Sequence, residues 1–210
     1  PRVFTLRRPE PVSVEHWIAR EIPPVGEEIY ISSLADLSAR LHFQMSEFGR
    51  PRQPLENSWE WVVAQIRRGR NNPYDWIRAL EPLRELGRGM ARDGAEWQEI
   101  FRYLNRSVTF NGVHRAFPEN SWQEIGEAEE WSEPLLGGEP ADQATINLML
   151  LALLDGAGVD AHPVYLSGRD AGRINPLFPS LFQFTQMIVA VQEADGSNHL
   201  VDASWPDSRP

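Results

Sequence analysis

The chain has 210 residues, which is enough for one full hydrophobic core or for a core with a smaller appendage. Hydrophobic residues make up 41% and charged residues 24%, as in ordinary globular proteins. The formal net charge of −10 argues against nucleic acid or an anionic membrane surface as a partner, because both would repel the chain. The absence of cysteine excludes disulfides, thiolate metal sites and a thiol nucleophile.

The N-terminal part reads as an extended arm. The chain begins at Pro1 without an initiator Met or the basic and apolar regions of a signal peptide, so we expect it to be a segment of a longer protein. Prolines are dense in residues 1–34, which predicts extended structure with isolated strands. Apolar and polar residues then alternate from Leu37 to Met45, which predicts a half-buried strand.

Helical spacing of apolar residues dominates the range Asn57–Ser107. Ser58 can cap a first helix, and Pro73 can start a second whose last apolar position is Leu83. Asp93 is expected to open a third helix. We expect these helices to form one layer of the fold.

Residues 112–140 carry a dense acidic patch. A carboxylate cluster can bind a hard cation, but the spacing here lacks the fixed ligand positions and mid-loop glycine of a calcium loop. We therefore interpret the patch as a solvated face and expect neither a metal site nor a cofactor. Its members are Glu124, Glu127, Glu129, Glu130 and Glu133.

The range Asp142–Ala161 contains the expected core helix. Between Gln143 and Leu154 almost every residue is apolar or small, so the helix has little room for a solvated face. Asp142 can cap its start, and Gly156 and Gly158 are expected to supply left-handed positions at its end. The apolar run is shorter than the roughly 20 residues that span a bilayer, so we expect no membrane insertion of this segment.

Three strands are predicted after this helix, and the second and third are joined around Asp195-Gly196. They cover Ala161–Ser167, Phe184–Gln192 and His199–Ala203. The predicted fold class is α+β, with a helical layer and a central buried helix packed on an antiparallel sheet.

Short motifs in a fixed order resemble the transglutaminase-like superfamily. The Gly137-Gly138 lead, the buried helix and the phrase LLDGAGVDAHPVYLS are similar to its nucleophile helix. The segments IPPVGEEIYISSLADL, VTFNG and GRDAGRINPLFPS resemble its connector, its lead-in and a loop between strands. The resemblance covers about residues 22–206 and implies a papain-like fold. It also implies that residues 1–50 are a connector and strand from a preceding β-rich domain, and that residues 51–210 are the transglutaminase-like domain.

Members of this superfamily carry a catalytic Cys at the start of the helix, a His that opens a following strand and an Asp on the next strand. The resemblance places Gln143 at the Cys position, Gln186 at the His position and Asp202, in LVDASWP, at the acid position. Gln143 cannot attack, because its amide nitrogen lone pair is delocalised, and Gln186 has no accessible pKa with which to relay a proton. The resemblance therefore implies a catalytically inactive domain.

The hairpin between the last two strands decides which residues share a face. A two-residue turn at Asp195-Gly196, the default for this dipeptide, would set Val189 opposite Asp202 and turn Gln186 to the other face. A loop of three or five residues would place Gln186 and Asp202 on one face. Since a His–Asp contact needs one face, the resemblance predicts the longer loop. Asp202 can also simply cap the turn formed by the Ala-Ser-Trp-Pro that follows it.

The resemblance, together with Gln143 and Gln186 at the catalytic positions, implies a binding or scaffolding module in a larger bacterial envelope protein. The resemblance implies an extracytoplasmic location, in the periplasm or cell envelope, and flanking β-domains of the same chain as neighbours. A degenerate cleft could still hold a peptide or protein ligand. Candidate binding residues are Trp131, His162 and Arg169.

Two other functions stay open. One is an amide or peptide hydrolase with a relocated, non-cysteine active site, which could pair Asp202 with His162 or His114 across an open cleft. The other is a structural spacer in which Trp122 or Trp131 fills the old cleft.

Overall fold

A computed structural model of the chain describes residues 57–69, 72–118 and 128–205, together with residues 18, 20, 21, 33, 36, 47, 48, 53 and 54. The expected strand from Leu37 to Met45 and nearly all of the expected connector, residues 1–50, lie outside the described residues. Glu124 and Glu127 of the acidic patch, and Trp122, lie outside them as well.

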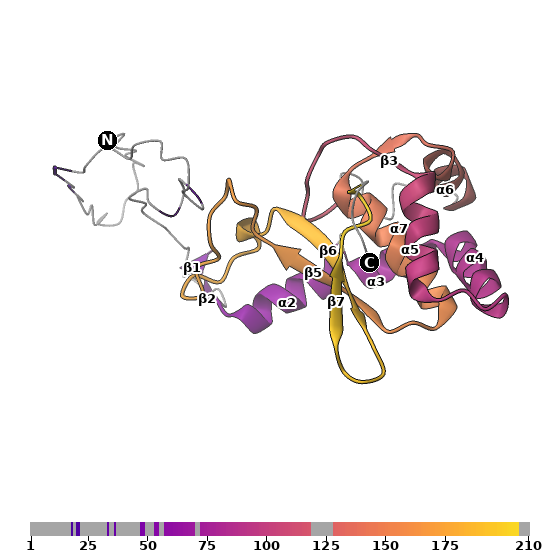
Figure 1. The fold of residues 1–210 in the computed structure, drawn as a ribbon. Coiled ribbons are helices and arrows are strands. Elements are labelled where there is room, and N and C mark those ends of the chain that lie inside the picture. Colours follow the sequence, from indigo (N-terminus) through magenta and orange to yellow (C-terminus); the bar gives the residue numbers. More distant parts are fainter. Residues whose placement is uncertain are drawn as a thin grey trace.

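Helices and strands are mixed along the chain, as the predicted α+β class requires (Figure 1). In chain order they are β1 (Glu47–Phe48), β2 (Gln53–Pro54), α2 (Trp59–Arg68), α3 (Pro73–Ala79), α4 (Glu81–Arg92), α5 (Trp97–Ser107), β3 (Thr109–Phe110), α6 (Ala128–Leu136), β4 (Pro140–Ala141), α7 (Gln143–Ala157), β5 (Ala161–Leu166), the 3-10 helix η2 (Leu181–Gln183), β6 (Gln186–Gln192) and β7 (Asn198–Val201).

Helix α7 is the centre of the fold. Every residue from Gln143 to Leu154 is buried, which confirms the predicted core helix. Helices α3, α4 and α5 pack against it, and so do strands β5 and β6 of the sheet (Figure 1). The helix is apolar all round because it has a protein layer on both sides. Among the described residues, no helix is both long and apolar enough to cross a membrane.

Both ends of α7 follow from local chemistry. The Asp142 carboxylate accepts a hydrogen bond from the Thr145 amide at 2.8 Å, and Gly158 ends the helix with a φ of 75°, as predicted. The prediction for Gly156 was wrong, because this residue lies inside the helix. A Cβ atom there would come within 2.0 Å of the Arg84 carbonyl oxygen, so the glycine permits close contact between α4 and α7.

The helical layer differs from the prediction at two boundaries. Ser58 caps α2 as expected, but the helix that starts at Pro73 ends at Ala79, and α4 begins separately at Glu81. Pro82 explains the break, because it has no N–H for the preceding turn and its ring clashes with the carbonyl four residues earlier.

Asp93 does not open a helix; it ends α4, and α5 begins at Trp97. Gly94, with a φ of 88°, separates the two helices. The true start signal is a capping box in which Glu96 and Glu99 satisfy each other's backbone N–H groups.

A short parallel pair of strands, β3 and β4, was not predicted. It carries the segment after α5 alongside the start of α7. Beyond it the Asn111 amide donates to the Ala141 carbonyl, and the Gln143 amide donates to the Val113 carbonyl, both at 3.0 Å. These bonds fix the position of the first residue of the core helix.

The C-terminal sheet is antiparallel with the order β5-β6-β7. Val189 pairs with Val201 and Gln192 with Asn198, so the two-residue turn at Asp195-Gly196 is wrong and the predicted longer loop is confirmed. Gly196 takes a φ of 84° within this loop, and its amide donates to the Glu193 carbonyl. If the pairing of β6 with β7 is extended by one residue beyond Val201, Asp202 lies opposite Ile188. Ile188 is two residues from Gln186, so Asp202 and Gln186 are on the same face of the sheet.

Candidate functional site

Two of the three positions singled out by the resemblance meet at the start of α7. Gln143 is the first residue of the helix and only 1% exposed, and its Nε2 donates a hydrogen bond to Asp202 Oδ2 at 2.6 Å. Asp202 directly follows β7. The buried helix and the last strand are thus joined by an amide–carboxylate contact.

Asn147 and Ser204 complete this polar cluster. Asn147 lies one turn after Gln143, is 0% exposed, and its Nδ2 donates to Asp202 Oδ1 at 2.9 Å and to the Met187 carbonyl at 3.0 Å. Its Oδ1 accepts from the Ala203 amide at 3.0 Å. The amide and hydroxyl of Ser204 both donate to Asp202 Oδ1, at 3.0 and 2.7 Å. The alternative in which Asp202 caps a turn is therefore confirmed together with its contact to Gln143.

Sequence reasoning missed Asn147 and Ser204, although each left a signal. Asn147 is the polar exception within the buried run from Ile146 to Leu154. A polar side chain there needs partners, because an unpaired buried amide is costly. Ser204 stands two residues after Asp202, the spacing at which an Asp side chain bonds the backbone of a turn.

The orientation of the Gln143 amide follows from its partner. A carboxylate only accepts hydrogen bonds, so the amide nitrogen faces Asp202 and Oε1 turns away. Oε1 is buried and has no hydrogen-bond partner, which costs about 1–3 kcal/mol. At the position where the resemblance expects a nucleophile, the chain therefore holds a buried amide that can neither attack nor carry a proton.

Gln186 is not joined to this cluster. It opens β6 and is half-buried, and its Nε2 would lie 3.1 Å from a Cβ atom placed on Gly168. Within the described part of the chain its side chain makes no hydrogen bond to Gln143 or Asp202. The shared face predicted for Gln186 and Asp202 is present, but the side chains do not form the contact of a triad.

The remaining candidate residues are dispersed. His162 is exposed and lies 3.1 Å from the Asp160 carboxylate, and His114 packs on the Phe110 ring with centroids 5.2 Å apart. Among the described residues, neither histidine forms a hydrogen bond or an ion pair with Asp202. Arg169 is exposed in the loop after β5, and Trp131 lies in α6 with its side chain outside the described residues.

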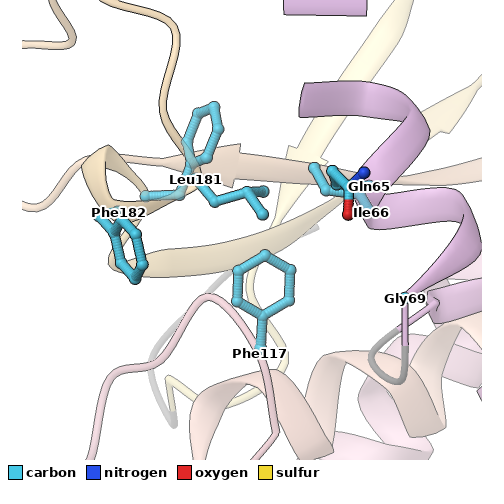
Figure 2. A pocket seen from close by; sticks show the side chains of 7 residues that line it. Gln65, Ile66, Gly69, Phe117, Leu181 and Phe182 are labelled. Carbon is cyan, nitrogen blue, oxygen red and sulfur yellow. The ribbon is translucent and has the colours of Figure 1, made fainter. Parts of the chain in front are cut away.

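A separate apolar pocket of about 410 Å³ opens between α2, the segment after β3, and η2 (Figure 2). Its residues are Gln65, Ile66, Gly69, Phe117, Leu181, Phe182 and Phe184. Sequence reasoning did not find it, because its walls come from three distant segments and no single stretch has a recognisable motif.

Aromatic contacts hold the pocket walls in place. Tyr165 lies between Phe117 and Phe184, with ring centroids 5.2 and 5.9 Å away. The Trp59 ring lies 6.1 Å from Phe184, and its Nε1 donates to the Pro176 carbonyl at 2.8 Å. Burial raises the pKa of Tyr165 well above its usual value, so its hydroxyl stays neutral. The pocket therefore has a supported and uncharged aromatic wall.

In the part of the chain that the structure describes, no three histidine or carboxylate side chains are placed to hold a metal ion. No protein-family model matches the sequence, and comparisons with curated proteins and with solved structures find no significant match.

Proposed function

We propose that this chain is a catalytically inactive, transglutaminase-like domain with a papain-like fold that serves as a binding or scaffolding module in a larger bacterial envelope protein. The resemblance of the sequence supports the family, the extracytoplasmic location and the flanking β-domains. The arrangement of helix and sheet around α7 is consistent with that fold.

The observation that carries the proposal is the hydrogen bond from Gln143 Nε2 to Asp202 Oδ2. The carboxylate at the acid position is engaged by amide and hydroxyl donors, where a catalytic site needs it to orient an imidazole. The alternative hydrolase is less well supported, since the described partners of His114 and His162 are Phe110 and Asp160. Gln143 and Asn147 are buried, so the cluster fixes helix and sheet, and a bound partner would contact residues outside it.

Turnover measurements test the absence of catalysis. The purified chain should release no product from p-nitrophenyl acetate or from glutamine-containing peptides above the rate of buffer alone. Turnover that disappears in the Asp202→Asn variant would contradict the proposal. The variant Leu177→Ala, at an exposed position in another loop, serves as the control for contaminating enzymes.

Rebuilding the missing groups tests the resemblance itself. If Gln143 and Gln186 hold the Cys and His positions, the double variant Gln143→Cys, Gln186→His should form a thiolate at lower pH than the single variant Gln143→Cys. The readout is the pH dependence of alkylation by iodoacetamide, followed by mass spectrometry of the intact chain. Equal pH profiles for the two variants would place residue 186 away from the nucleophile position.

A further inference from the structure

The apolar pocket beside α2 has the features of a binding site separate from the Gln143–Asp202 cluster. Figure 2 shows Phe117 and Leu181 turned toward one space, with Ile66 on α2 opposite Leu181 and the Phe182 ring at the outer margin. No charged residue lines the pocket. Its volume of about 410 Å³ lies at the lower end of the roughly 300–1,000 Å³ typical of ligand pockets.

The openness of the pocket favours one side chain of a larger partner over a free small molecule. Phe182, part of its wall, is 97% exposed. A small ligand usually buries most of its surface, which a pocket bounded by so exposed a ring does not allow. A partner that places one apolar side chain here would cover Phe182 and gain the rest of its affinity from contacts outside the pocket.

A positive charge next to the pocket favours an acidic residue beside the partner's apolar side chain. Arg68 directly precedes Gly69 of the lining and lies three residues after Gln65, so it shares that side of α2. Arg67 and Arg68 are exposed, and neither forms an ion pair within the described part of the chain. The net charge of −10 does not cancel their effect, because charges more than about 8 Å away are largely screened at physiological salt. A carboxylate beside the apolar anchor would therefore meet a guanidinium that no described carboxylate already pairs with.

We propose that this pocket binds a peptide segment through an aromatic or large aliphatic side chain, with an acidic residue next to it set against Arg68. This inference rests on the proposed binding role and names the chemistry of the partner. The pocket is also close in sequence to a segment that contacts the start of α7. Phe117 lies four residues after Val113, whose carbonyl accepts from the Gln143 amide, and Phe184 lies two residues before Gln186. A bound segment could therefore continue toward the start of α7.

Capped tetrapeptides test the proposal on the whole chain. Acetyl-Ser-Phe-Glu-Ser-amide is compared with the same peptide carrying Ala for Phe and with one carrying Gln for Glu, by NMR titration. The first peptide should bind saturably below about 1 mM, replacement of Phe should weaken binding at least about tenfold, and replacement of Glu about threefold to fivefold.

Protein variants separate the pocket from the rest of the surface. Phe182→Ala should weaken the Phe-Glu peptide about tenfold, whereas Leu177→Ala, at a 90% exposed position outside the lining, should change nothing. Arg68→Glu should weaken the Phe-Glu peptide but not the Phe-Gln peptide, and Arg67→Glu should have a smaller effect. Both phenylalanine and arginine positions are at the surface, so these variants are expected to fold.

Several results would overturn the proposal: no saturable binding up to about 5 mM peptide, equal binding of the Phe and Ala peptides, or no effect of Phe182→Ala. A dimer that Phe182→Ala dissociates in sedimentation velocity would assign the pocket to a second copy and overturn the peptide assignment. Mass spectrometry of the peptide after the titration keeps the two proposals distinct. A cleaved peptide contradicts the inactive domain, whereas an intact peptide that does not bind contradicts the pocket assignment.

Discussion

At the scale of single residues, the start of α7 is defined by buried polar groups that satisfy one another. Asn147 links three segments, because its amide bonds Asp202, the Met187 carbonyl on β6 and the Ala203 amide after β7. Asn147 is fully buried, so the loss of its side chain leaves these partner groups without a hydrogen bond. The cluster therefore holds helix and sheet in one arrangement.

Asn147→Leu should lower the free energy of unfolding by about 2–4 kcal/mol, because buried groups of Asp202, Met187 and Ala203 lose their partner. Asn105→Leu is the matched control. The Asn105 amide bonds the Ala203 and Trp205 carbonyls from a half-buried position, where water can replace it, so the loss should be about 0.5–1.5 kcal/mol. Urea unfolding of both variants measures the difference, and equal losses would contradict the buried network.

Gln143→Glu should make the stability of the chain depend on pH. The new carboxylate would lie beside Asp202 in a buried site, where burial and like charge raise its pKa in the folded state. A carboxyl group with a raised folded pKa contributes stability at low pH and loses it as pH rises through that value. The variant should therefore approach the parent near pH 4 and fall behind by about 2–4 kcal/mol at pH 7.

Urea unfolding of the Gln143→Glu variant and the parent between pH 4 and 7 measures this difference. Gln186→Glu is the control, since Gln186 is half-buried and outside the cluster. A pH-independent difference between the Gln143→Glu variant and the parent would show that residue 143 does not face Asp202.

Predictions for single residues were correct where a local sequence pattern is enough to determine the role of the residue. The caps at Ser58 and Asp142 were found because a side-chain oxygen before an apolar run has a single common role. The contact between Gln143 and Asp202 came only through the resemblance, since no local pattern relates residues so far apart. The cluster around Asn147 was missed because its partners are backbone groups, which every residue carries.

At the scale of elements, close contact between α4 and α7 organises the helical layer. A Cβ atom on Gly87 would come within 2.0 Å of the Leu153 carbonyl oxygen, and one on Gly156 equally close to the Arg84 carbonyl oxygen. The two glycines let the helix backbones touch over about one turn of each helix. Arg84 reinforces the contact from the rim, where its Nε donates to the Asp155 carboxylate at 2.6 Å.

Gly156→Ala and Gly87→Ala should each lower the free energy of unfolding by at least about 2 kcal/mol, because a methyl group cannot fit without moving a helix. Gly89→Ala, on the same helix α4 with open space around the glycine, should instead raise stability by up to about 1 kcal/mol through helix propensity. Thermal and urea unfolding distinguish the two outcomes. A neutral Gly156→Ala would mean that α4 and α7 do not touch.

The sequence predicted whether a segment is a helix or a strand better than it predicted where that segment begins and ends. Strands β5 to β7 and helix α7 were found from apolar patterns of several residues, and their observed limits differ by a few positions. The break before α4 was missed because the apolar spacing continues across Pro82, and the start of α5 at Trp97 was missed because Asp93 is itself a favoured cap residue. Pairs as short as β3 and β4 carry too few residues for any period to appear.

At the scale of the whole molecule, α7 connects two layers that would otherwise contact each other little. Helices α3, α4 and α5 lie against one side of it, and strands β5 and β6 against another. The sequence predicted this arrangement, because a helix without a polar face must be covered on all sides. The apolar pocket could not be predicted in the same way, since Phe117, Ile66 and Phe182 belong to three segments that are distant in the sequence.

A shared core helix predicts that both layers unfold together. Amides of α4, α7 and β6 should exchange hydrogen with the same free energy and the same dependence on urea, because none of these elements keeps its packing once α7 is lost. Gly156→Ala should lower all three by an equal amount, although β6 belongs to the sheet and the substituted contact lies between α4 and α7. Hydrogen exchange followed by mass spectrometry measures this. If β6 kept its exchange free energy while α4 lost protection, the sheet would be a separate folding unit, and the polar cluster of Gln143, Asn147 and Asp202 would not couple it to the helices.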